Sequence, residues 1–196
     1  MPEGLAIARS ELILGGQKSG KSRRAEQLAS AWLAQSPRHR AVLIATAHAG
    51  DDEMRERIAR HRQDRAARVP GMLTIEEPLA LAEAIMQHGN TQTLVLVDCL
   101  TLWLTNDLFP SADFESNRPL AQELPARAAT FLIAIEKSLG PVVVVSNEIG
   151  LGVIPMGRPT REFVDTLGRL NQDVAQVCER VTWMAAGFPL TLKGQP

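Results

Sequence analysis

Apolar runs and helix-like stretches alternate along this chain. The continuously apolar runs lie at residues 11–15, 41–46, 93–98, 141–148 and 181–187. Apolar positions with helical spacing fill residues 21–35, 51–68, 78–88, 119–138 and 161–178. Apolar strands separated by helices are typical of a parallel sheet that is covered on both faces. The pattern therefore predicts an α/β fold with a mostly parallel central sheet flanked by helices.

The end of the chain predicts one further element. Residues 190–193 (LTLK) are expected to form an edge hairpin with the last core strand. The length of 196 residues suits one domain spanning residues 1–196, with residues 1–10 as an N-terminal extension. Apolar residues make up 45% and charged residues 22%, which is ordinary for a globular protein with a sizeable core.

Charge and hydropathy exclude several classes of partner. The net charge of −1 gives no electrostatic basis for binding nucleic acid or an anionic membrane. No apolar stretch approaches the roughly 18–20 residues that span a bilayer, and the N-terminus does not resemble a signal peptide. The two cysteines, Cys99 and Cys178, do not make a disulfide framework. We expect a cytoplasmic protein with no integral membrane segment and no nucleic-acid partner.

Four polar clusters follow the predicted strands. In parallel sheets, ligands bind beyond the carboxyl ends of the strands. We therefore expect the four clusters to gather at one edge of the sheet. They span residues 15–22, 46–51, 98–106 and 146–155.

The first cluster, GGQKSGKS, has the spacing G-x-x-x-x-G-K-S. Such a loop turns its backbone N–H groups toward phosphate, and the following helix adds the positive end of its dipole. Lys21 can reach the terminal phosphates, and the Ser22 hydroxyl can bind Mg²⁺. The sequence thus predicts a P-loop NTPase-like nucleoside triphosphate site. Asp98, which closes a strand, is a second candidate Mg²⁺ ligand. It could also cap the following helix, and the two roles can coexist.

A regulatory GTPase and a simple small-molecule kinase are two other kinds of P-loop protein to compare with this sequence. A regulatory GTPase would carry an Asn-Lys-x-Asp guanine reader, and the chain has none. The string Asp165 to Gly168 matches D-x-x-G but lies within a helical pattern. A small-molecule kinase without nucleotidyl transfer stays open, because Arg158 and Arg161 could form its lid.

The helix predicted at residues 51–68 carries a histidine on its apolar face. Met54, Ile58 and His61 fall at i, i+4 and i+7. A neutral imidazole can attack an α-phosphate and hold the nucleotide as a phosphoramidate. The alternative is a half-buried structural histidine. The flanking arginines either bind phosphate oxygens or form a solvated face; they are Arg57, Arg60, Arg62 and Arg65.

The segment SNEIGLGVIP, residues 146–155, leaves a buried strand through a turn. Asn147 and Glu148 are expected at the carboxyl end of that strand. Glu148 could orient a metal-bound water, act as a base toward an acceptor hydroxyl, or cap the turn.

Together these segments resemble the bifunctional adenosylcobinamide kinase / adenosylcobinamide-phosphate guanylyltransferase family of cobalamin biosynthesis. The resemblance runs from Leu12 to Lys193. It rests on GGQKSGKSRRAEQLA, LIATAHAGDDEMRERIARHR, LVLVDCLTLWLTNDL, VVVVSNEIGLGVIP and REFVDTLGRLNQDVA.

The resemblance implies the chemistry of two steps. ATP or GTP phosphorylates adenosylcobinamide, and GTP then gives its GMP through a guanylylated histidine to adenosylcobinamide phosphate. It implies His61 as that histidine and a homo-oligomer, with a trimer as one candidate. From the loop motif and the strand end we also expect Lys21 to be a catalytic residue and Ser22 and Asp98 to be Mg²⁺ ligands. The implied nucleotide-binding residues are Gly15, Gly16, Gln17, Lys18, Ser19, Gly20, Lys21, Ser22, Ala45, Thr46, Ala47, Arg62, Gln63, Asp64, Arg65, Glu76 and Asp98.

The chain departs from the pattern of this family at two places. The family commonly has arginine where Lys18 stands and a small residue where Gln17 stands. A tryptophan-bearing segment usually follows the histidine, whereas AARVPGMLTIEE has none. The nucleotide contact therefore falls on either Glu76 or Glu77.

Overall fold

The computed structural model of the chain describes residues 5–48, 52–109 and 124–195. Within one helix, the side chains of residues 52–54, 57 and 61 also lie outside the description. The predicted helix start at residue 119 and part of the polar cluster at 46–51 therefore fall outside the described residues.

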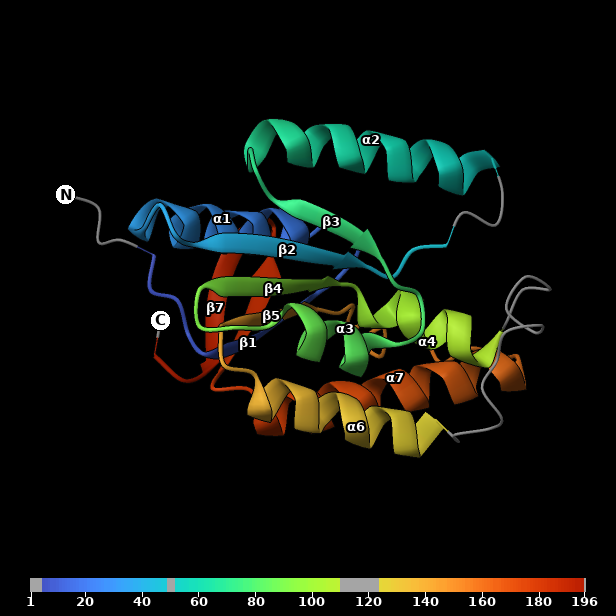
Figure 1. Cartoon of the computed structure of the whole chain (residues 1–196). Coiled ribbons are helices and arrows are strands. Elements are labelled where there is room, and N and C mark those ends of the chain that lie inside the picture. The colour runs from blue at the N-terminus through green and yellow to red at the C-terminus, as the bar shows by residue number, and fades with distance from the viewer. Residues whose placement is uncertain (1–4, 49–51, 110–123, 196) are drawn as a thin grey trace.

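The described strands form one seven-stranded sheet in the order β3-β2-β4-β5-β1-β6-β7 (Figure 1). Neighbouring strands are parallel except for β6 and β7, which are antiparallel. The prediction of a mostly parallel α/β sheet with an edge hairpin at its end is confirmed. The strands are β1 (Ser10–Gly15), β2 (Arg40–Ala45), β3 (Leu73–Glu76), β4 (Thr93–Asp98), β5 (Val142–Val145), β6 (Arg180–Ala185) and β7 (Phe188–Lys193).

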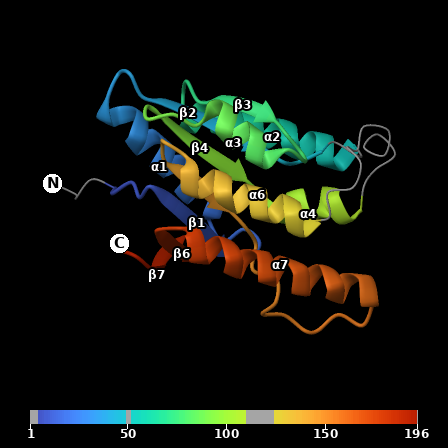
Figure 2. The same ribbon diagram turned by 60° about the horizontal axis from the view of Figure 1, so that its bottom comes forward.

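Helices cover both faces of the sheet, with α1 and α2 on one side and α3, α6 and α7 on the other (Figure 1). Turning the molecule brings α6 and α7 to the front (Figure 2). The described part contains no helix that is both long enough and apolar enough to cross a membrane. The helices are α1 (Lys21–Gln35), α2 (Asp52–Arg68), α3 (Leu81–His88), α4 (Leu100–Leu108), α6 (Leu124–Lys137) and α7 (Arg158–Val177).

The strand residues alternate between two hydrophobic cores. Leu12 and Leu14 of β1 face α3, α6 and α7, whereas Ile13 between them packs against α1. In β4, Val95 and Val97 likewise lie in the first of these cores, and Leu94 and Leu96 lie in the second. Because successive side chains of a strand point to opposite faces, a continuously apolar strand supplies both cores.

Two strands differ from the prediction. The sequence did not predict β3. This four-residue edge strand carries no continuous apolar run and exposes Leu73 and Glu76 at its ends. The reading of 141–148 as one strand was too long, since β5 ends at Val145. β5 lies between β1 and β4, and Val145 is the register partner of both Ile13 and Asp98. The ends of these three strands therefore meet.

Candidate functional site

The loop between β1 and α1 begins and ends on glycines that need special backbone geometry. Gly15 has φ of +151°, and a Cβ there would stand 2.5 Å from the carbonyl oxygen of Met184. Gly20, the N-cap of α1, has φ of +103°. A side chain at either position would be strained, so the glycines let the loop wrap closely against β6.

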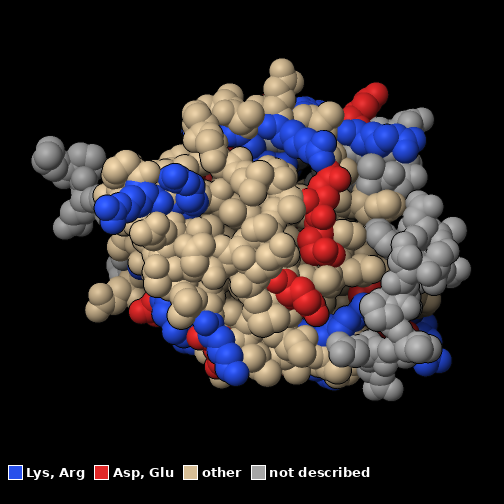
Figure 3. Space-filling model, in the orientation of Figure 1, with Lys and Arg blue, Asp and Glu red and all other residues tan. Residues whose placement is uncertain are grey.

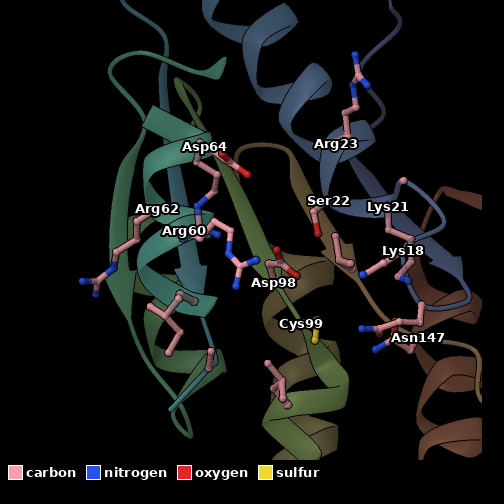
Figure 4. Close-up of a pocket in the computed structure, with 18 of the residues that line it drawn as sticks. Lys18, Lys21, Ser22, Arg23, Arg60, Arg62, Asp64, Asp98, Cys99 and Asn147 are labelled. Atoms are coloured by element: carbon pink, nitrogen blue, oxygen red, sulfur yellow. The ribbon is translucent and has the colours of Figure 1, made fainter. Parts of the chain in front are cut away.

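This loop borders a cavity of about 620 Å³ at the carboxyl edge of the sheet (Figure 4). The strands β2, β3, β4 and β5, together with α2 and α4, supply its other walls. The polar clusters predicted to gather at one edge do so in the described part of the chain. The lining residues are Gln17, Lys18, Ser19, Gly20, Lys21, Ser22, Arg23, Ala45, Ala47, Ile58, Arg60, Arg62, Asp64, Arg65, Glu76, Asp98, Cys99, Leu102, Val145 and Asn147.

Lys21 lies at the base of this loop and is largely buried. Its ammonium donates hydrogen bonds to the carbonyl oxygens of Gly15 at 2.9 Å and Gly16 at 2.6 Å. Burial lowers the pKa of Lys21, while the nearby Cys99 and Asp98 oppose that shift. The loop therefore holds a cation at the position from which it can reach bound phosphates.

Ser22 and Asp98 both point into the cavity (Figure 4). The N-cap of α4 is Cys99, and no side chain caps that helix end, so Asp98 does not have the alternative capping role. Among the described residues, no group of three or more His, Cys, Asp or Glu side chains could hold a metal. Mg²⁺ bound with a nucleotide needs only one or two protein ligands, because phosphates and water complete its shell. Ser22 and Asp98 fit that requirement.

The helix α2 faces the loop across the cavity and supplies four of its charged lining residues. Arg60, Arg62, Asp64 and Arg65 line the cavity, and basic side chains run along this edge of the molecule (Figure 3). Arg65 is buried; desolvation lowers its pKa, and the charge of Asp98 opposes that shift most. The side chain of His61 lies outside the described residues, so its nucleophilic and structural alternatives both stay untested. Its position in α2 falls between two residues that line the cavity.

The two adjacent glutamates at the end of β3 have different surroundings. Glu76 lines the cavity and forms an ion pair with Arg62. Glu77 accepts hydrogen bonds on Oε1 from the backbone N–H groups of Leu79 at 3.0 Å and Ala80 at 2.8 Å. Glu77 therefore holds the start of α3, and Glu76 is the one available to a ligand.

Some predicted nucleotide contacts are not among the lining residues. Thr46 is fully buried, and its hydroxyl donates to the carbonyl oxygen of Cys99 and accepts from its N–H. Thr46 thus joins the ends of β2 and β4 instead of reaching the cavity. Gln63 is exposed outside the cavity lining, and Gly15 and Gly16 contribute through the carbonyls that Lys21 binds.

Other lining residues were not among the predicted contacts. Of these, Asn147 stood in a segment that the sequence had singled out, two residues beyond the end of a buried strand. Ile58 stood on the predicted apolar face of its helix. The approach of the others to the cavity depends on how distant elements pack. The residues are Arg23, Ile58, Cys99, Leu102, Val145 and Asn147.

Three further candidates have other contacts in this structure. Glu148 accepts a hydrogen bond from the N–H of Gly150 at 2.9 Å, which is the turn-capping alternative. Arg158 pairs with Glu162, and Arg161 donates to the carbonyl oxygens of Pro155 and Met156. Neither arginine lines the cavity, so the structure gives no support for a lid built from them.

The loop, its lysine and the carboxylate of Asp98 define a P-loop nucleotide-binding protein. The fold agrees: the flagellar accessory protein FlaH of Methanocaldococcus jannaschii has a TM-score of 0.53 to this structure at 11% identity, covering 99% of this chain and 82% of that one. The family described as cobinamide kinase / cobinamide phosphate guanyltransferase matches residues 11–192, and the chain belongs to that family.

Curated relatives agree over nearly the full length. The bifunctional adenosylcobalamin biosynthesis protein CobP of Pseudomonas aeruginosa is 46% identical over 187 residues, covering 95% of this chain and 98% of the relative. The bifunctional adenosylcobalamin biosynthesis protein CobU of Escherichia coli is 34% identical, covering 93% and 98%. The predicted family, a bifunctional kinase and guanylyltransferase, is confirmed. The individual site residues and the histidine intermediate stay predictions.

Proposed function

We propose that this chain phosphorylates adenosylcobinamide and then transfers GMP from GTP to the phosphorylated product, with His61 as the intermediate carrier. The observation that carries the proposal is the cavity, which joins a P-loop on one side to the arginine-bearing face of α2 on the other. One wall suits the terminal phosphates, and the opposite wall suits the rest of the nucleotide.

The kinase step needs positioning and charge stabilisation more than covalent chemistry by the protein. The bond between the γ-phosphorus and the β–γ bridging oxygen breaks, and a bond to the acceptor hydroxyl oxygen forms. The hydroxyl proton leaves to solvent. Lys21 and the loop amides hold the phosphates, and Ser22 and Asp98 would hold Mg²⁺, which supplies neutralising charge at the phosphate oxygens.

The guanylyl step proceeds through a phosphoramidate on His61. The neutral ring nitrogen attacks the α-phosphorus, and pyrophosphate leaves with the electrons of the α–β bridging bond. A phosphate oxygen of the acceptor then attacks the same phosphorus and frees the imidazole. The arginines of α2 that line the cavity, Arg60, Arg62 and Arg65, are placed to bind the α-phosphate or the acceptor phosphate.

We further propose that the protein acts as one domain and as a homo-oligomer. All described strands belong to one sheet, which supports the single domain. The segment before α7 exposes Leu151, Val153, Ile154 and Met156, and apolar surface of this kind commonly lies at protein contacts. Sedimentation analysis gives the oligomeric state directly.

Labelling with [α-³²P]GTP tests the histidine intermediate. We expect acid-labile, alkali-stable label on the wild-type protein and none on His61→Ala. His88→Ala, at the end of α3 and away from the cavity, is the matched control and should label normally. Undiminished label on His61→Ala would refute the role of His61. Phosphorylation of cobinamide without any protein label would favour a kinase that lacks the nucleotidyl step.

A further inference from the structure

We propose that Asn147 is a catalytic residue whose carboxamide binds the γ-phosphate of the nucleotide; the assignment rests on the proposed kinase step. Asn147 lines the cavity that the P-loop borders. Its side chain points into that cavity from the same side as Lys18 and Lys21 (Figure 4).

The strand order places Asn147 between the two halves of the phosphate site. β5 separates β1, which leads into the P-loop, from β4, which ends at Asp98. The backbone N–H of Ser146 donates to Ile13 at 3.0 Å, and that of Glu148 donates to Gly15 at 3.1 Å. These bonds continue the pairing with β1 beyond the end of β5, up to the first residue of the P-loop.

The side-chain alternation of a strand continues through this extension. Val145 and Asn147 both line the cavity, whereas Ser146 between them is fully buried. A period of two explains why Asn147 faces the cavity and its neighbours do not. Glu148 instead bonds the N–H of Gly150 within its own turn.

Both backbone groups of Asn147 are held by side chains from helices. Its N–H donates to the hydroxyl oxygen of Thr101 in α4 at 3.1 Å, and its carbonyl accepts from Nδ2 of Asn171 in α7 at 3.1 Å. Asn171 is itself buried. Thr101 and Asn171 are therefore positioning residues, because they fix the direction in which the carboxamide of Asn147 extends.

The carboxamide is the part of Asn147 left for a ligand. Within the described residues the carboxamide makes no hydrogen bond, whereas both backbone groups of Asn147 are hydrogen-bonded. An amide N–H donates well to a phosphate oxygen and adds no charge beside Lys21. The contact persists as the γ-phosphoryl group moves from the bridging oxygen to the acceptor hydroxyl. During this transfer the negative charge is spread over the equatorial oxygens of the phosphoryl group, and the carboxamide stabilises it. Asn147 gains and loses no proton in this step.

The first test is binding, which needs no acceptor. Dissociation constants for a β,γ-imido GTP analogue and for GDP are measured on full-length wild type, Asn147→Ala, Asn147→Asp and Glu148→Gln. Because Asn147→Ala loses one hydrogen bond to a charged group, we expect it to bind the analogue about 10-fold more weakly. We expect unchanged binding of GDP, a larger loss in the isosteric Asn147→Asp because its carboxylate repels phosphate, and no change in Glu148→Gln. Equal effects on analogue and GDP, or no effect on either, would overturn the proposal.

The second test is turnover with adenosylcobinamide. Asn147→Ala should lower kcat of phosphorylation about 10-fold or more, with the KM for adenosylcobinamide unchanged. Thr101→Val should lower kcat less, and Thr101→Ser should restore it, because the serine hydroxyl can still accept from the N–H of Asn147. Full activity of Asn147→Ala would contradict the assignment. A wild-type protein without cobinamide phosphorylation would refute the proposed function, while the binding test would still decide the role of Asn147.

Discussion

The ammonium of Lys21 donates a hydrogen bond to the carbonyl oxygen of Gly16 at 2.6 Å, within the same loop that is expected to hold phosphate. The lysine therefore lies folded against its own loop. A triphosphate entering the cavity offers it charged oxygens in exchange for neutral carbonyls, and bonds between charged partners are the stronger ones.

Replacing this lysine tests the exchange. Lys21→Ala should weaken the binding of GTP and ATP about 100-fold and abolish both transfer activities, since a buried charge-assisted contact with phosphate is lost. Isothermal titration with a non-hydrolysable analogue measures the first effect. Lys137→Ala, an exposed lysine at the end of α6, is the control and should bind as wild type does. Binding retained in Lys21→Ala would exclude the P-loop as the phosphate site.

The adjacent pair Glu76 and Glu77 allows a matched comparison. Glu76→Gln should weaken GTP binding or raise its KM in guanylylation, because its carboxylate lines the cavity beside Arg62. Glu77→Gln should leave the KM unchanged and alter only thermal stability, because its side chain bonds the start of α3. Steady-state kinetics and melting curves on both variants separate the two roles. The reverse outcome would assign the nucleotide contact to Glu77.

Thr46 should matter for stability instead of nucleotide contact. Thr46→Val leaves the buried N–H and carbonyl of Cys99 without their side-chain partner, which costs about 2 kcal/mol in the free energy of unfolding. Urea denaturation measures the loss. Thr130→Val removes a hydroxyl on an exposed helix position and should change stability by less than about 0.5 kcal/mol. A Thr46→Val protein with wild-type stability but impaired nucleotide binding would favour the predicted nucleotide contact of this residue.

The two cysteines should be inert at neutral pH. Burial raises the pKa of Cys99 from 9.0 to about 11 and that of Cys178 to about 12. Between pH 9 and the raised pKa values, the thiols stay protonated in the folded protein and ionise in the unfolded chain. Their contribution to stability is therefore complete below pH 9 and is lost as pH rises toward 11 and 12. A thiol reagent at pH 8 should label neither residue in the native protein and both in denaturant. Rapid labelling of the native protein would contradict this burial.

The sequence predicted the phosphate loop well because its spacing encodes local backbone geometry. The residue types and spacing of Gly15, Gly20 and Lys21 mark the turn and the helix start, although Gly15 also has to fit closely against Met184 of β6. The α/β class followed for a similar reason, since apolar runs and helical spacing are local signals. Asp98 could be placed at a strand end from the run TLVLVD alone.

The rest of the site depends on contacts between distant parts of the chain. Thr46 follows a strand directly, as a ligand-binding residue would, yet it turns to the end of β4. The sequence could not tell whether Glu76 or Glu77 faces the cavity, because that depends on where β3 ends, and this edge strand has no apolar run. The position of Asn147 in the cavity depends on where β5 ends and on side chains from two helices, which bind its backbone. The role of His61 stays a prediction, because its side chain lies outside the described residues.

The place of β5 between β1 and β4 has a consequence during synthesis on the ribosome. The P-loop and Asp98 have both been translated once residue 98 is made, but the strand that holds them in register comes more than forty residues later, at Val142–Val145. A nascent chain therefore cannot gain stability from nucleotide until that strand has emerged, and a fragment ending before it should not be rescued by GTP.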